Sequence, residues 1–276
     1  MYRVAAFDLD GTLLRSDSTL SGRTLKALQA CHSHGMRLVI ATGRSPKTAA
    51  LVIPDGFTPS CWVCYNGAEI WNGGGRIAQN AMDVETAKEI VSVVRSLCPQ
   101  VRLYAGIDDV LYTEAERDPA IFTQVGDLHS VIDRPVAKIA FDKVHTIDED
   151  LLRRHLPRSC RFIITCGNRL GEIMTPTATK AWGVNTAARN WDLGIRDAIA
   201  FGDETNDVEM IFESGLGVAM ANAHPEVKEA ADHITASNDE DGVAQVLEGL
   251  LTGEVTTKNR PVGHDRHVQA EAGGNR

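Results

Sequence analysis

The feature that most constrains this chain is a series of short apolar runs that alternate with helical patterns. The runs are Arg3–Asp8, Arg37–Ala41, Cys61–Tyr65, Ala198–Phe201 and Gly217–Met220. Such runs lack a polar face, as strands do when helices cover both sides of a parallel sheet. Helical patterns lie between them, for example at Ala178–Trp191. The alternation predicts an α/β protein with a doubly wound, Rossmann-like parallel sheet.

The alternation is interrupted in the middle of the chain. Beginning with the amphipathic helix expected at Asp83–Leu97, the pattern changes to short strand-like segments with one further helix among them. That order is typical of a small α+β unit with an open sheet. We therefore expect a core formed by residues 1–82 and 172–250, with an α+β domain inserted at 83–171. Residues 251–276 lack apolar periodicity, which predicts a disordered tail.

Composition and charge exclude several classes of function. The net charge of −9 disfavours phosphate neutralisation, so no nucleic-acid partner is expected. No apolar stretch is long enough for a membrane span, and no export signal is recognised, so we expect no membrane partner and a cytoplasmic location. The six cysteines show no disulfide framework, and Cys61 and Cys64 are interpreted as buried thiols. The sequence makes no prediction of oligomeric state.

Two carboxylates end the first apolar run. In open parallel sheets, ligands bind at the carboxyl ends of the strands. Asp8 and Asp10 are two residues apart, so both side chains are expected to point into one crevice. Their mutual repulsion would be relieved by a divalent cation such as Mg²⁺. By itself this pattern is equally compatible with an ordinary turn.

Further polar clusters follow the other runs. Thr42 and Gly43 offer a hydroxyl and backbone N–H groups that suit a phosphate-like anion. Lys180 opens a helix, where the helix dipole opposes a cation, and this indicates a nearby anion. After Ala198–Phe201 come two acids and an amide that would share a helix face: Asp203, Asn206 and Asp207. Each cluster has an ordinary structural explanation, but together they provide the groups needed for Mg²⁺-assisted phosphoryl transfer.

The combination resembles the haloacid dehalogenase (HAD) superfamily, in its Cof-type branch of sugar-phosphate phosphatases. The resemblance is carried by FDLDGTLL (7–14), ATGR (41–44), YNGA (65–68), Lys180, GDETNDVEM (202–210) and ADHITASNDEDGVAQVLE (231–248). Two positions depart from the family pattern. Ala181 follows the lysine where glycine is common, and Glu204 stands where asparagine is frequent. In this family the inserted domain is a cap that covers the active site.

The resemblance implies roles for the catalytic and metal-binding residues. Asp8 would be the nucleophile that forms an aspartyl-phosphate, and Asp10 would be the general acid and base. Mg²⁺ would be held by Asp8, the main-chain carbonyl of Asp10, and Asp203. Asp207 would bond to these ligands rather than to the ion. The phosphoryl oxygens would be held by the side chains of Thr42, Lys180 and Asn206 and by the N–H groups of Leu9 and Gly43.

The resemblance also raises expectations for the surrounding loops. Arg44 and Asn66 would either face the cap and the substrate or make structural hydrogen bonds within the core. Gly11 would allow a tight turn after Asp10, and Thr12 would close that turn with a local hydrogen bond. The polar turn Cys166–Arg169 would contact the leaving group.

The function that this resemblance predicts is a Mg²⁺-dependent phosphatase, a phosphoric monoester hydrolase that acts on a small phosphorylated metabolite such as a sugar phosphate. A phosphomutase on the same scaffold would also use two acids in this spacing. A non-catalytic module that binds a metabolite is a further alternative. The three differ in product: free phosphate, an isomerised substrate, or a bound ligand that is not turned over.

Overall fold

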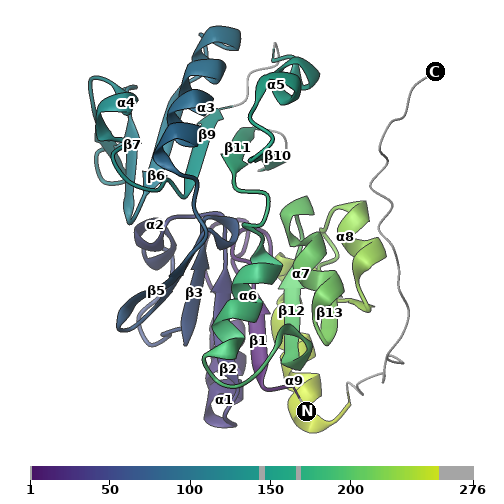
Figure 1. The fold of residues 1–276 in the computed structure, drawn as a ribbon. Coiled ribbons are helices and arrows are strands. Elements are labelled where there is room, and N and C mark those ends of the chain that lie inside the picture. Colours follow the sequence, from purple (N-terminus) through teal and green to yellow (C-terminus); the bar gives the residue numbers. More distant parts are fainter. Residues whose placement is uncertain (1, 143–146, 166–168, 255–276) are drawn as a thin grey trace, which may run out of the picture.

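The computed structural model describes residues 2–142, 147–165 and 169–254, which form a larger α/β domain and a smaller α+β domain (Figure 1). Residues 166–168 of the turn expected to contact the leaving group, and the expected tail from residue 255 onward, lie outside the described residues. Helix α9 (Gly242–Thr252) continues past residue 250, where the tail was expected to begin. No helix in the described ranges is both long and apolar enough to cross a membrane.

The larger domain is built on an eight-stranded sheet with the order β14-β13-β12-β1-β2-β3-β4-β5. Pairing is parallel from β14 to β3 and antiparallel in β3–β4 and β4–β5. The strands are β1 (Val4–Phe7), β2 (Arg37–Ala41), β3 (Cys61–Cys64), β4 (Glu69–Asn72), β5 (Gly75–Gln79), β12 (Ala198–Gly202), β13 (Leu216–Ala219) and β14 (His233–Ile234). The parallel core predicted from the apolar runs is present.

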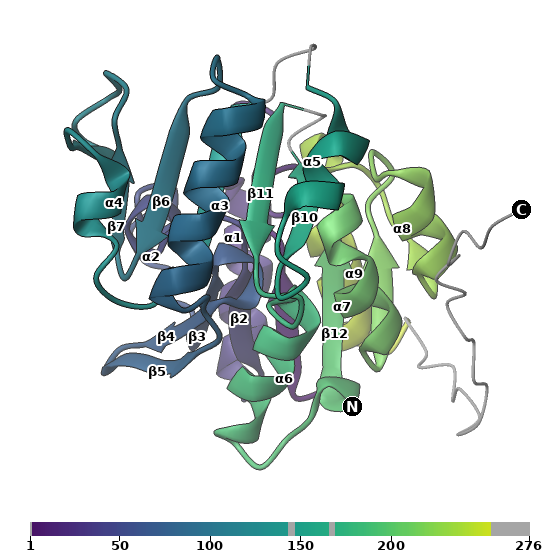
Figure 2. The same ribbon diagram turned by 45° about the horizontal axis from the view of Figure 1, so that its top comes forward.

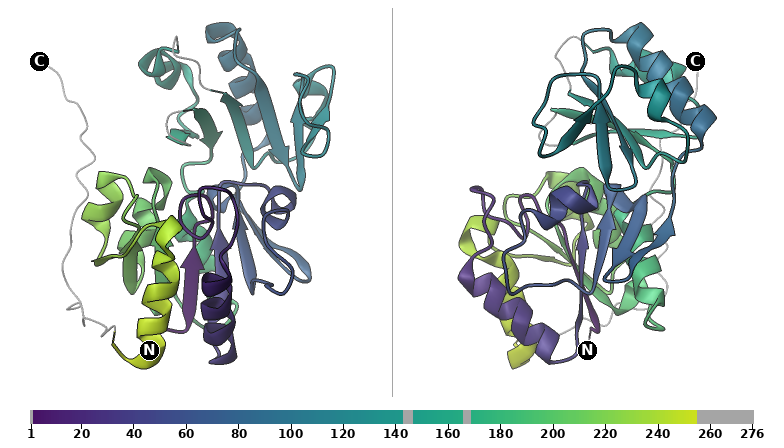
Figure 3. Two further views of the ribbon diagram at one scale, coloured as in Figure 1. Left: turned by 180° about the vertical axis from the view of Figure 1, so that it is seen from behind. Right: turned by 90° about the vertical axis from the view of Figure 1, so that its left-hand side faces the viewer.

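Helices cover both faces of the core sheet. Helices α1 (Gly22–Ser33) and α9 lie side by side on one face, and α6 (Lys180–Arg189) and α7 (Val208–Glu213) lie on the other (Figures 1 and 3). The other α-helices described in this domain are α2 (Pro46–Ala50) and α8 (Pro225–Ala230). All four residues of β1 are fully buried, because this strand is central and covered on both sides.

The smaller domain contains a six-stranded sheet with the order β10-β11-β9-β6-β7-β8, and α3 lies across one face of it (Figure 2). Its elements are α3 (Val84–Leu97), β6 (Leu103–Ile107), β7 (Val110–Thr113), β8 (Phe122–Gln124), α4 (Leu128–Val131), β9 (Lys138–Asp142), α5 (Glu149–His155), β10 (Arg161–Thr165) and β11 (Leu170–Met174). Strand β11 pairs with β9 and β10, so this sheet extends beyond the boundary expected at residue 171. We call this domain the cap.

The two faces of the cap sheet pack against different partners, because successive strand residues point to opposite faces. In β6, Leu103 and Ile107 belong to the core that includes α3, whereas Tyr104 packs with Tyr65 of the larger domain. Gly106 lies on the same face as Tyr104, and a Cβ atom there would come within 2.7 Å of the Tyr65 ring. The face away from α3 therefore lies against the larger domain.

Cys61 and Cys64 occupy the two ends of β3. Both are buried, and neither forms a disulfide, as the sequence predicts. Burial raises the pKa of the Cys61 thiol to about 12, so this thiol is unreactive at neutral pH.

Candidate active site

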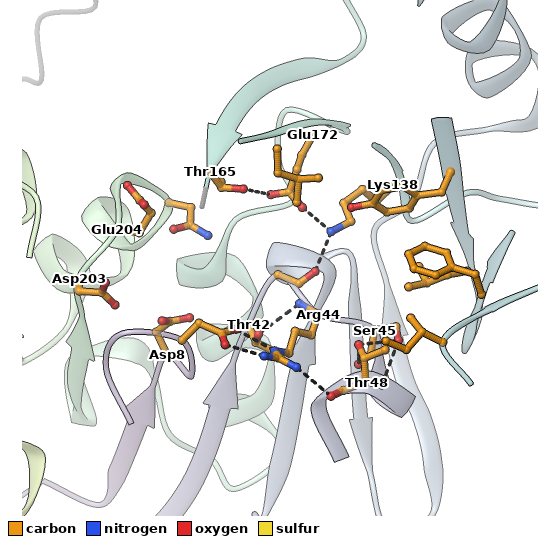
Figure 4. A pocket seen from close by; sticks show the side chains of 18 residues that line it. Asp8, Thr42, Arg44, Ser45, Thr48, Lys138, Thr165, Glu172, Asp203 and Glu204 are labelled. Atoms are coloured by element: carbon orange, nitrogen blue, oxygen red, sulfur yellow. Dashed lines mark hydrogen bonds and ion pairs between the residues drawn. The ribbon is translucent and has the colours of Figure 1, made fainter. Parts of the chain in front are cut away.

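The polar clusters meet at the carboxyl end of the core sheet. Strands β12, β1 and β2 are neighbours in the sheet, so the loops that follow them lie side by side although they are far apart in sequence. Asp203, Asp8 and Thr42 stand in these three loops. A pocket of about 310 Å³ opens here between the core and the cap (Figure 4).

Lys180 is the buried cation of the site. The Thr179 side chain caps α6 by accepting the N–H of Trp182 at 3.0 Å, which makes Lys180 the first residue of the helix. Its Nζ lies 2.6 Å from Asp8 Oδ1 and 2.7 Å from Asp207 Oδ1, and only 1% of the side chain is exposed. Burial opposes its charge, but the two carboxylates outweigh that effect and raise the pKa of Lys180. The lysine therefore stays protonated.

Asp8, Asp203 and Asp207 converge around this lysine, with candidate ligand atoms within 4.8 Å of one another. Burial raises the pKa of Asp8 well above its ordinary value, opposed by Lys180 and reinforced by the charges of Asp207 and Asp203. Burial, followed by the charge of Asp207, raises the pKa of Asp203 to about 7. When all three carboxylates are ionised, one lysine leaves two negative charges unbalanced. That charge equals the charge of a divalent cation, and an all-oxygen donor set suits Mg²⁺.

The acids of the loop after β12 differ in how their oxygens are used. Asp207 Oδ2 accepts the backbone N–H groups of Asp203 and Glu204, each at 3.1 Å, so both Asp207 oxygens already have protein partners. Asp203 Oδ1 accepts the Thr12 hydroxyl at 2.6 Å. Thr12 closes its own turn through its backbone, because its N–H donates to the carbonyl of Leu9 at 3.4 Å, whereas its hydroxyl bonds to a neighbouring loop. Because β1 and β12 are adjacent, Asp203 lies within reach of the Thr12 hydroxyl.

The loop after β1 is shaped by Gly11 and Arg44. Gly11 has a φ of +86°, and a Cβ atom at this position would lie 2.3 Å from Asp203 Oδ2, so only glycine fits. The Asp10 side chain turns toward Arg44, whose Nε and Nη2 donate to its two oxygens at 2.8 and 2.6 Å. Arg44 also donates to the carbonyl of Thr48 at 3.3 Å. This bidentate pair fixes the position of the Asp10 carboxylate at the pocket.

Thr42 and Asn206 also line the pocket. The Thr42 hydroxyl accepts the N–H of Arg44 at 3.2 Å, which leaves its own proton to be donated. Asn206 Nδ2 donates to Asn66 Oδ1 at 2.9 Å, and no group within the described ranges donates to the buried Asn206 Oδ1. A water molecule on a bound cation would supply that missing donor.

A buried ion pair between Lys138 and Glu172 was missed at the sequence level. Lys138 Nζ also donates to the carbonyl of Gly43 at 2.8 Å. Glu172 Oε2 accepts Asn66 Nδ2 and the Thr165 hydroxyl, each at 3.0 Å. The pair therefore joins two cap strands to two loops of the core, one of which carries Thr42. Figure 4 shows Lys138, Glu172 and Thr165 above Thr42. The only sequence signal was a charged residue beside apolar residues in each of two short segments, Val136–Phe141 and Leu170–Met174.

Lys138→Met is expected to lower the free energy of unfolding by about 3–5 kcal/mol, because it leaves Glu172 as an uncompensated buried charge. The double variant Lys138→Met/Glu172→Leu is expected to recover part of that loss, since both charges are removed together. Equilibrium unfolding in urea, followed by circular dichroism, measures both values. A single variant as stable as the wild type would contradict this account of the pair.

Comparison with known proteins decides the family. Residues 5–247 match the family model described as haloacid dehalogenase-like hydrolase. The chain belongs to this family. Its sequence is 30% identical over 260 residues to the 5-amino-6-(5-phospho-D-ribitylamino)uracil phosphatase YitU of Bacillus subtilis, and the alignment covers 88% of this chain and 95% of that protein.

A further relative and a solved structure agree with this assignment. The HMP-PP phosphatase of Yersinia enterocolitica is 29% identical over 268 residues, covering 91% of this chain and 96% of that protein. The crystal structure of such a hydrolase from Bacteroides thetaiotaomicron matches with a TM-score of 0.77 at 28% identity, covering 91% of this chain and 100% of that one. The Cof-type HAD assignment and the α/β fold class are thereby confirmed. The names of these relatives agree with a phosphoric monoester hydrolase.

Proposed function

We propose that this haloacid dehalogenase-like hydrolase is a cytoplasmic, Mg²⁺-dependent phosphatase of a small phosphorylated metabolite, in particular a sugar phosphate. The observation that carries the proposal is the position of the Asp8 carboxylate. It lies at the end of β1, lines the pocket, and is flanked by Lys180 and two further acids. Relatives named as phosphatases support the reaction class.

In the proposed reaction, Asp8 attacks phosphorus and forms an aspartyl-phosphate while the leaving alcohol departs. Asp10 protonates that alcohol and then removes a proton from the water that hydrolyses the intermediate. Arg44 supports this role by holding the Asp10 carboxylate at the pocket through two hydrogen bonds. The cap would exclude bulk water while the intermediate exists.

The phosphoryl oxygens are proposed to be held by donors from three loops and from the first turn of α6. These are the side chains of Thr42, Lys180 and Asn206 and the N–H groups of Leu9 and Gly43. Thr42 suits the role because its hydroxyl already accepts one hydrogen bond and retains a proton to donate. Fixed donors of this kind stabilise the charge that develops as the phosphoryl group is transferred.

The residues proposed to hold Mg²⁺ are Asp8, Asp203 and the main-chain carbonyl of Asp10. Asp207 is proposed not to bind the ion directly but to orient the residues that do, because both its oxygens already bond to Lys180 and to backbone N–H groups. When bound, the ion would neutralise charge on the transferring phosphoryl group.

Release of phosphate from p-nitrophenyl phosphate tests the proposal. Turnover is expected with Mg²⁺, is expected to fall to background with EDTA, and should return when Mg²⁺ is added in excess. Accumulation of an isomerised sugar phosphate without free phosphate would instead indicate a phosphomutase. Metal-dependent ligand binding without turnover across a broad panel of phosphate esters would indicate a non-catalytic module.

A further inference from the structure

The cap contributes an apolar wall to the active-site pocket. It consists of five side chains that line the pocket: Tyr104, Leu111, Ile121, Phe122 and Leu170. All five belong to, or pack against, the cluster on the cap-sheet face that lies against the core. The wall therefore shares one pocket with the acids at the carboxyl end of the core sheet. A substrate whose phosphate group lies against Asp8 would extend its leaving group toward the wall.

Two aromatic rings of the wall are held in place. The ring centroids of Tyr104 and Phe122 are 5.4 Å apart, and the rings are nearly perpendicular, at 75°. The guanidinium of Arg117 lies 4.8 Å from the centre of the Phe122 ring and 5.5 Å from that of Tyr104. Arg117 is itself fixed by Asp142 at 2.5 Å. The rings are thus positioned before a ligand arrives.

Several polar side chains near the apolar wall are already engaged with one another. On the cap side, Lys138 and Glu172 form their ion pair, and Thr165 donates to Glu172. On the core side, the hydroxyls of Ser45 and Thr48 lie 2.9 Å apart and bond to each other. Sugar hydroxyls placed against the apolar wall would lose hydrogen bonds to water and gain few in return, which costs free energy. A flat apolar ring placed there would gain from burial.

We infer that the preferred substrates carry, beyond the carbon chain next to the phosphate, a flat aromatic ring that packs against Phe122 and Tyr104. This inference rests on the proposed phosphatase function and narrows its substrate class. A phosphorylated sugar or polyol that bears such a ring is a better substrate than the same sugar phosphate without it.

Matched pairs of phosphate esters test the inference. Flavin mononucleotide and ribitol 5-phosphate share the polyol and the ester and differ only in the ring; uridine 5′-monophosphate and ribose 5-phosphate form a second pair with a smaller ring. The ring-bearing member of at least one pair is expected to have a kcat/KM about tenfold higher or more. In Phe122→Ala, the ratio of the kcat/KM of the ring-bearing ester to that of its ring-free partner is expected to fall toward one.

Tyr112→Ala is the matched control, because Tyr112 lies on the same cap sheet but packs on the face that carries α3. It should leave the ratio unchanged. Equal kcat/KM values within both pairs, or a ratio that Phe122→Ala does not alter, would overturn the inference.

Binding separates this inference from the phosphatase proposal. The fluorescence anisotropy of flavin mononucleotide reports binding without turnover. Binding that Phe122→Ala weakens and Tyr112→Ala does not, in a protein that releases no phosphate from any ester, would leave the apolar ring site standing and refute the phosphatase. Phosphate release without any preference for ring-bearing esters would support the phosphatase function and refute the ring site.

Discussion

Asp8→Asn is expected to lower phosphate release by about 10⁴-fold or more, as loss of a catalytic nucleophile does in other enzymes. The amide has nearly the same shape as the carboxylate but cannot attack phosphorus. No phosphoenzyme should form. Rapid acid quench with radiolabelled substrate detects the aspartyl-phosphate directly, and steady-state phosphate release gives the rate.

Asp10→Asn provides the contrast to Asp8→Asn. Here the nucleophile is intact, so the intermediate is still expected to form, but leaving-group departure and its hydrolysis should each slow by about 10²–10⁴-fold. Normal turnover in Asp10→Asn would contradict the division of labour between the two acids. Undiminished turnover in Asp8→Asn would refute the nucleophile assignment.

Lys180→Met is expected to reduce both stability and activity. The side chain is almost fully buried and contacts two carboxylates at 2.6 and 2.7 Å, so its removal leaves buried negative charge without a partner. The expected loss is about 3–5 kcal/mol in the free energy of unfolding. Losing a donor to the phosphoryl group should also lower kcat by about 10²–10³-fold. Urea unfolding and phosphate release measure the two effects.

The stability of the metal-free protein should depend on pH through the same cluster. The folded-state pKa of Asp203 is raised to about 7, against an ordinary value of 3.8. Between these values the folded chain holds a proton that the unfolded chain has released, so the stability from this group is lost as the pH rises through 7. Lys180 stabilises the ionised form of Asp203, which is the form present above pH 7. The decrease in the free energy of unfolding caused by Lys180→Met should therefore be larger at pH 8 than at pH 5.

Lys26→Met is the control for Lys180→Met, because Lys26 is an exposed lysine on α1. It should change neither stability nor turnover. A Lys180→Met protein with wild-type stability at pH 8 would show that the lysine does not balance the acids. Wild-type turnover in that variant would exclude its proposed role at the phosphoryl group.

Some elements of the cap were not predicted because their local patterns are weak. Strand β8 has only three residues, and α4 has only four, too few for periodicity to distinguish them from a loop. Strand β11 carries Gly171 and Glu172, which are unusual inside a strand. Glu172 is accommodated there because Lys138 and Asn66 from other segments satisfy its carboxylate.

The sequence by itself determined the core sheet and the position of its acids. Apolar runs without a polar face require burial on both sides, and a buried parallel sheet brings its carboxyl ends to one edge. For this reason the amino-acid pattern alone predicts that Asp8, Thr42 and Asp203 lie together, and their loops are indeed adjacent.

Only the tertiary structure decided which partner each polar group meets. Thr12 bonds to Asp203, and Lys138 of the cap bonds to the carbonyl of Gly43, across 191 and 95 residues of sequence. Strand alternation shows that a strand has two faces but not which one lies against the core. The apolar wall of the pocket therefore became visible only once the cap sheet lay against the core, since contacts between distant segments are set by packing.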